Sequence, residues 1–142
     1  MAAGDFYFAI NATFRFIYGR WGEEALIDYW RALGREYYAE LSRRFCKGGL
    51  EEVEQYWKDY FKLEPGGVVK ITRTDRAVVI EVQDCPAIRW LKGAGRKVMP
   101  SYCRHCFHVS SAIAEEANLV FELEDGDGTC RQTFRSREGK AC

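Results

Sequence analysis

The residues best suited to chemistry lie in one short segment, positions 101–108, which reads Ser-Tyr-Cys-Arg-His-Cys-Phe-His. It contains Cys103, His105, Cys106 and His108, and these include both histidines of the chain. Cysteine thiolates and neutral imidazoles bind zinc well, and the same two groups serve as nucleophile and general base in enzymes. The segment therefore predicts either a metal site or thiol chemistry.

Two further cysteines lie beside predicted turns. Cys85 precedes Pro86 at the end of an apolar run, and Cys130 follows the glycine-rich turn 125–128. A pair of cysteines separated by two residues is also a spacing found in metal knuckles. We therefore expect a zinc ion, with iron as an alternative, whose predicted ligands are Cys85, Cys103, Cys106 and Cys130.

The helical wheel separates the two kinds of side chain. On a predicted helix over 101–117, Cys103 and Cys106 share one side with small and apolar residues, whereas His105 and His108 point toward the other side. One helix cannot bring all four groups to one ion. An irregular start of this helix would let either histidine turn inward as a fourth ligand.

Two other interpretations of these cysteines stay open. Buried cysteine packs like a small apolar residue, so Cys103 and Cys106 are also compatible with close packing of the helix on a sheet. A cysteine pair at a helix start is also typical of redox sites, because the helix dipole lowers the thiol pKa.

The histidines suggest a catalytic arrangement. His108, Ser111 and Glu115 fall on one helical face, so the carboxylate of Glu115 is expected near the imidazole of His108 and would help to set its protonation. His105 is the second candidate base. The alternative is that these residues simply lie on an exposed helix face, which commonly carries histidine, serine and glutamate without any catalytic function.

Composition limits the class of protein. The chain has 142 residues, 47% of them hydrophobic, which suits one domain, and equal numbers of acidic and basic residues argue against a nucleic-acid partner. The N-terminal segment resembles neither a signal peptide nor a membrane span. We therefore expect a cytoplasmic protein with reduced cysteines, in which Cys46 is a core or surface thiol and Cys142 an exposed spare thiol.

Periodicity predicts an α+β fold. Apolar residues at steps of three and four indicate helices over about 6–18, 22–46 and 50–63. Alternating, β-branched segments then predict two antiparallel hairpins, 68–72 with 77–82 and 118–124 with 129–135, separated by helices over 86–92 and 101–117. The expected architecture is an antiparallel sheet with helices on one face, divided into a helical half (1–63), a cysteine-containing half (67–136) and a flexible tail (137–142).

The order of these motifs resembles the L-2-amino-thiazoline-4-carboxylic acid hydrolase family. The resemblance rests on Cys85-Pro86, the Cys103 and Cys106 pair opening a helix, the Gly-Asp-Gly-Thr-Cys130 turn, and Trp-Gly-Glu-Glu-Ala and Gly-Leu-Glu-Glu-Val before the N-terminal helices. A related pattern occurs in the vinyl reductase domain, a small-ligand or metal-binding module. The resemblance implies a cytosolic α+β domain that opens a carbon–nitrogen bond of a small sulfur heterocycle.

Two functions follow from these observations. In the first, a cysteine thiolate or zinc-bound water attacks the ring carbon while His108 handles the proton and Glu115 orients it, and aromatic helices wall an apolar pocket. In the second, the cysteines form a structural zinc site in a module that binds a small ligand without catalysis. The aromatic content is also compatible with a homodimer.

Overall fold

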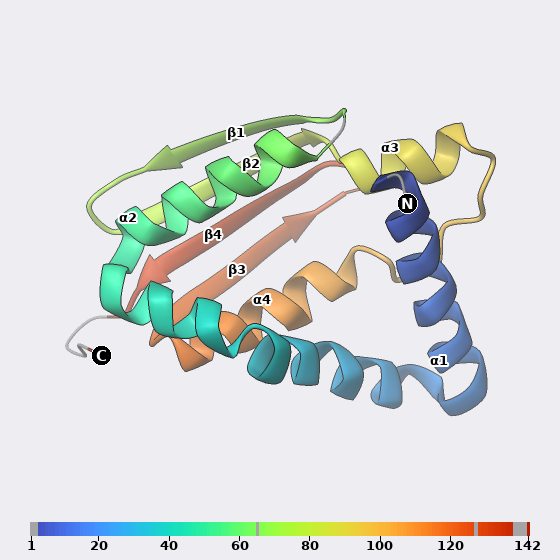
Figure 1. Ribbon diagram of the computed structural model, residues 1–142, viewed down its shortest axis with the longest axis horizontal. Coiled ribbons are helices and arrows are strands. Elements are labelled where there is room, and N and C mark those ends of the chain that lie inside the picture. The colour runs from blue at the N-terminus through green and yellow to red at the C-terminus, as the bar shows by residue number, and fades with distance from the viewer. Residues whose placement is uncertain (1–2, 65, 127, 138–141) are drawn as a thin grey trace.

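The computed structural model describes residues 3–64, 66–126, 128–137 and 142. The elements are α1 (Ala3–Ala32), the π-helix η1 (Leu33–Tyr37), α2 (Ala39–Leu63), β1 (Val68–Arg73), β2 (Ala77–Asp84), α3 (Pro86–Gly93), α4 (Arg104–Glu116), β3 (Leu119–Asp125) and β4 (Cys130–Ser136) (Figure 1). The chain is thus an α+β protein with a four-stranded antiparallel sheet, as predicted. Asp127 of the predicted turn and residues 138–141 of the predicted tail lie outside the described residues.

Two glycines interrupt the long helices where the sequence predicts helix ends. Gly22 has φ 88° and ψ −176°, and Gly49 has φ 63° and ψ −151°, backbone conformations that glycine adopts readily. The prediction of one continuous helix over 22–46 is wrong, because residues 33–37 form a π-helix. In the described part of the chain, none of the helices combines the length and apolarity needed to cross a lipid bilayer.

The π-helix coincides with a close contact between helices. A β-carbon built on Gly34 would lie 2.6 Å from Cβ of Ala112 and 2.6 Å from the carbonyl oxygen of Val109, both in α4. Glycine is therefore required where η1 meets α4. Short π-helical turns often occur at functional sites, and here the turn precedes Tyr38, which lines the cavity described below.

The four strands pair in the order β1-β2-β4-β3. Both predicted hairpins are present, since β1 pairs with β2 and β3 pairs with β4. The central pairing of β2 with β4 places Val78 opposite Phe134 and Ile80 opposite Gln132. Beside the second hairpin turn, the Gly126 N–H donates to the Thr129 carbonyl oxygen at 2.7 Å.

One face of the sheet forms the main core. Alternate residues of β2 are buried and pack with residues of α2 and α4, so both helices lie on this face, as Figure 1 also shows. Burying each large apolar side chain contributes about 1.5–3 kcal/mol. The fully buried members of this core are Phe45, Val53, Val78, Ile80 and Phe134.

A second apolar cluster joins α1 to α3 and to the turn before α4. Figure 1 shows the first half of α1 standing beside α3 at one end of the sheet. Phe14 and Trp30 are central to this cluster, with their ring centroids 5.2 Å apart. Asn11, a polar residue in the apolar N-terminal segment, accepts a hydrogen bond from the Met99 N–H and donates one to the Lys97 carbonyl oxygen, both at 2.9 Å. These bonds hold the loop that leads into α4.

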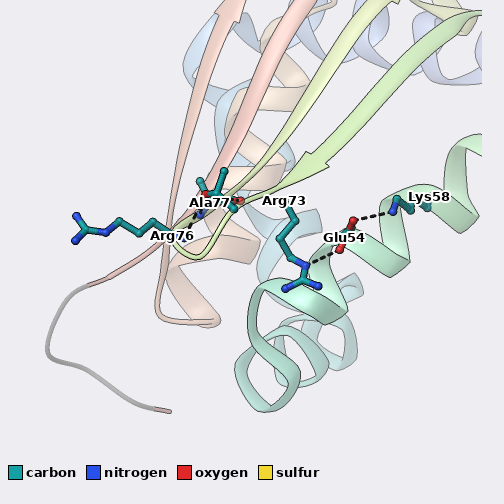
Figure 2. A network of polar contacts seen from close by, with 6 residues as sticks. Glu54, Lys58, Arg73, Arg76 and Ala77 are labelled. Atoms are coloured by element: carbon teal, nitrogen blue, oxygen red, sulfur yellow. Dashed lines mark hydrogen bonds and ion pairs between the residues drawn. The ribbon is translucent and has the colours of Figure 1, made fainter.

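A small ionic network joins α2 to the edge strand β1. The carboxylate of Glu54 lies between Lys58, one helical turn along α2, and Arg73 of β1 (Figure 2). The distances are 2.7 Å to Lys58 Nζ and 2.5 Å to Arg73 Nε. Both cations are substantially exposed, so the network orients α2 on the sheet with a modest contribution to stability.

One cysteine pair differs from the sequence-based expectation. Cys46 of α2 and Cys142 are joined by a disulfide, with their Cα atoms 5.5 Å apart. The expectations that Cys46 is a core or surface thiol and that Cys142 is a spare thiol are therefore wrong. Spacing along the chain could not indicate this pair, because 96 residues separate the two cysteines. The other four cysteines are reduced thiols.

Candidate functional site

A cavity of about 180 Å³ lies between the helices and one end of the sheet. Its walls come from α1, α2, α3, α4, the ends of β2 and β4, and the turns that precede α4 and β4. Aromatic and aliphatic side chains form most of the lining. The polar groups at the cavity wall therefore act in a region with little bulk water, where electrostatic interactions are strong.

The four cysteines singled out from the sequence all line this cavity. Cys85 comes from the start of α3, Cys103 from the turn before α4, Cys106 from α4, and Cys130 from the start of β4. They are half-buried and reduced. Within the described residues, however, no three or more histidine, cysteine or acidic side chains are grouped closely enough to hold a metal ion. The arrangement of these donors does not fit a zinc site in this geometry.

Cys106 and His105 form a hydrogen-bonded pair. Sγ of Cys106 lies 3.5 Å from Nε2 of His105, and Nδ1 of His105 contacts the carbonyl oxygen of Tyr102. A carbonyl oxygen accepts hydrogen bonds, so Nδ1 carries the proton of the neutral ring. Nε2 is then the acceptor, and the Cys106 thiol donates to it. This is the arrangement of a nucleophile, a base and a group that orients the base.

Burial keeps both members of this pair neutral. It raises the pKa of Cys106 to about 12, against a weaker opposing effect of a backbone hydrogen bond. Burial also lowers the pKa of His105, although its hydrogen bond to Tyr102 acts in the opposite direction. The imidazole is consequently a free base at neutral pH, and the thiol keeps its proton.

The structure turns His105 inward, which is the alternative that an irregular helix start left open. The helical wheel places it away from Cys106, whereas both side chains line the same cavity. His105 stands in the first turn of α4, which begins at Arg104 directly after the turn formed by residues 100–103. Three-residue hydrogen bonds in this turn, such as Arg104 N–H to the Ser101 carbonyl oxygen, replace the helical spacing that the wheel assumes.

The other predicted catalytic residues lie elsewhere. His108 is absent from the described cavity lining, and its ring stacks on Trp30 with a centroid distance of 5.7 Å. Glu115 accepts a hydrogen bond from Arg31 Nη2 at 2.6 Å. Burial lowers the pKa of His108, with Arg104 and Arg31 acting in the same direction. The structure thus brings Glu115 to Arg31 and places His108 among aromatic rings.

Sequence reasoning missed the tyrosines of the cavity wall. Burial raises the pKa of Tyr38 to about 12, and it also raises the pKa of Tyr60 and Tyr102. Tyr56 and Tyr60 are four residues apart on α2, with Trp57 and Phe61 beside them. These two adjacent rows of aromatic residues were the available signal. A helix that only packs on a sheet needs a single apolar row, so the second row could have indicated a pocket wall.

Sequence reasoning also missed the carboxylate of Glu64. This residue follows α2 directly, lines the cavity, and accepts a hydrogen bond from the hydroxyl of Tyr7 in α1. Burial raises the pKa of Glu64. The contact closes one end of the cavity by joining α1 to the end of α2.

Comparison of the chain with protein-family models and with curated proteins found no match. The resemblance to the amino-thiazoline carboxylic acid hydrolases therefore stays a prediction from its motifs.

Proposed function

We propose that this protein is a small-molecule hydrolase of the cytoplasm that opens a carbon–nitrogen bond of a heterocyclic substrate. Cys106 is its nucleophile and His105 its general base. The observation that supports this most is the Cys106–His105 contact, oriented by the Tyr102 carbonyl and placed in the wall of a largely apolar cavity. A volume of about 180 Å³ suits a single ring, because an engineered cavity of about 150 Å³ accommodates benzene.

The reaction follows from the protonation states of the pair. His105 Nε2 takes the thiol proton as Cys106 Sγ bonds to the electrophilic ring carbon. The tetrahedral adduct then collapses, the carbon–nitrogen bond breaks, and the leaving nitrogen receives the proton from His105. Water, deprotonated by His105, attacks the same carbon and displaces Cys106, which recovers its proton. The net change is the addition of one water molecule across the carbon–nitrogen bond.

A second candidate is a module that binds a small ligand without turnover. The raised pKa of Cys106 favours it, because a thiol that holds its proton tightly is a poor nucleophile without an additional activating charge. In this alternative the same cavity retains the ligand, and Cys106 and His105 form a polar contact of the wall.

The test uses 2-aminothiazoline, a small cyclic amidine, with ring opening followed by mass spectrometry. Wild-type protein and the control variant Glu51→Gln, at an exposed position of α2, are expected to give the product, which is heavier by one water molecule. Cys106→Ser should give none, and His105→Gln should lower the rate by about 100-fold. Equal turnover by Cys106→Ser contradicts the proposed nucleophile. Binding without turnover by the wild type supports the second candidate.

The zinc or iron ion predicted from the cysteines needs a separate measurement. Metal content of untagged protein, determined by inductively coupled plasma mass spectrometry, distinguishes the cases. Near-stoichiometric metal that is lost in both Cys85→Ser and Cys103→Ser would support a cysteine metal site. Metal-free protein with full turnover would support thiol chemistry alone.

A further inference from the structure

The charged side chains of the described cavity wall are acidic and not basic. Among the described residues that line it, Glu64 is the one with an acidic side chain, and none is a lysine or an arginine. Most of the remaining wall is aromatic or aliphatic. A buried charge in such surroundings is costly unless a partner compensates it.

Glu64 is a half-buried carboxylate in the cavity wall. Tyr7 donates one hydrogen bond to Oε2. A carboxylate accepts several hydrogen bonds through its two oxygens. Burial raises the pKa of Glu64, and no cation among the described residues lowers it again. Glu64 therefore retains the capacity to accept a further donor, and a positively charged donor inside the cavity would offset its partial desolvation.

Aromatic rings surround the same space. Tyr7, Trp57, Tyr60 and Tyr102 line the cavity together with Glu64. The Trp57 and Tyr60 rings pack edge to face, with centroids 5.3 Å apart. The faces of tryptophan and tyrosine rings attract organic cations, and a carboxylate beside several such rings is a recurring solution for binding protonated amines.

We propose that the cavity binds a small organic cation, a protonated amine or amidinium on a frame of about one ring, with Glu64 as its counter-ion and the tyrosine and tryptophan rings as its walls. This inference deepens the proposed function, because it names the class of substrate that Cys106 would attack. It also separates this chain from the family that its motifs resemble. A cationic side chain would favour a carboxylate substrate, and the described lining contains no lysine or arginine.

A cationic substrate would also assist the chemistry. Positive charge next to a thiol favours the thiolate, and the Cys106 thiol lines the same cavity as Glu64. An amidinium carbon is in addition more electrophilic than the carbon of the neutral amidine.

Isothermal titration calorimetry with three benzene derivatives of matched size tests the inference on the full chain. The ligands are benzamidine, which is cationic, benzamide, which is neutral, and benzoate, which is anionic. We expect wild-type protein to bind benzamidine at least about tenfold more tightly than benzoate, with benzamide between them. Benzoate binding as tightly as benzamidine, or no binding of benzamidine, would overturn the proposal without any variant.

Two variants test whether the carboxylate of Glu64 is the counter-ion of the bound cation. Glu64→Gln should weaken benzamidine binding by about tenfold or more and leave benzamide binding unchanged. Glu51→Gln, at an exposed carboxylate of α2, the helix that Glu64 follows, is the matched control and should behave as wild type. Retained benzamidine affinity in Glu64→Gln would overturn the role of Glu64. The outcome is separable from that of the proposed hydrolysis, since Cys106→Ser should lose turnover and keep the preference for benzamidine.

Discussion

Nε2 of His105 lies 3.5 Å from Sγ of Cys106, although the two residues are neighbours in the sequence. Adjacent helical residues normally point about 100° apart, and here the hydrogen bond from Nδ1 to the Tyr102 carbonyl orients the His105 ring in the first turn of α4. The pair connects the fold to the proposed chemistry, because the same turn places both side chains in the cavity wall.

Acid should destabilise the protein through His105. Its pKa is lower in the folded chain than in the unfolded chain, so the unfolded state binds the proton more readily. The stabilisation is complete above the unfolded pKa of about 6.5 and is lost as pH falls through and below that value. Urea unfolding at about pH 7.5 and about pH 5 should show a smaller loss of stability in His105→Gln than in wild type. An identical loss in both proteins would contradict a buried neutral imidazole.

Removing the side-chain amide of Asn11 should destabilise the fold. Asn11→Ala leaves the Met99 N–H and the Lys97 carbonyl without this partner, at an expected cost of about 1–3 kcal/mol in the free energy of unfolding. Thr13→Ala is the control, because the Thr13 hydroxyl makes an exposed bond to the Ala9 carbonyl of its own helix. Chemical denaturation measures both, and equal small effects would show that the loop before α4 does not need Asn11.

The contact between η1 and α4 predicts opposite effects for two glycines. Gly34→Ala would place its β-carbon 2.6 Å from Cβ of Ala112, so we expect a loss of about 1–3 kcal/mol in unfolding free energy. In Gly19→Ala the new β-carbon meets nothing within 4 Å, and the higher helix propensity of alanine should stabilise α1 by up to about 1 kcal/mol. Thermal melts of the two variants check the sign. A stabilised Gly34→Ala would contradict the close approach.

Peptide mapping without reduction should detect one linked pair of cysteines. After oxidation in air we expect a peptide that joins Cys46 to Cys142, because their Cα atoms are 5.5 Å apart. Cys85, Cys103, Cys106 and Cys130 should remain alkylatable once the protein is unfolded. A disulfide within that group of four would contradict the arrangement of the cavity wall.

The sequence predicts the parts of this fold that depend on local patterns. β-Branched alternation indicates both hairpins, and the glycines at 22 and 49 mark the helix breaks because few other residues adopt their backbone angles. The π-helix was not predictable in this way. It coincides with the contact of Gly34 with α4, which lies more than seventy residues further along the chain.

The candidate site was predictable only in part. The cysteines and His105 stand out by residue type, and the structure places all of them at one cavity. Glu64 carries no comparable signal, since an isolated glutamate at a helix end is ordinary and its burial depends on Tyr7, 57 residues earlier. The pairing of His108 with Glu115 assumed that helical spacing alone selects partners, whereas Arg31 of another helix binds the carboxylate of Glu115.

The most direct test of the Cys106–His105 pair is the rate at which iodoacetamide alkylates Cys106, followed by peptide mass spectrometry at neutral pH. Because Nε2 of His105 is the acceptor for the thiol proton, His105→Gln should slow this rate by about tenfold or more. The rates at Cys85 and Cys103 serve as internal controls and should not change. An unchanged rate at Cys106 in His105→Gln would contradict the assignment of His105 as its base.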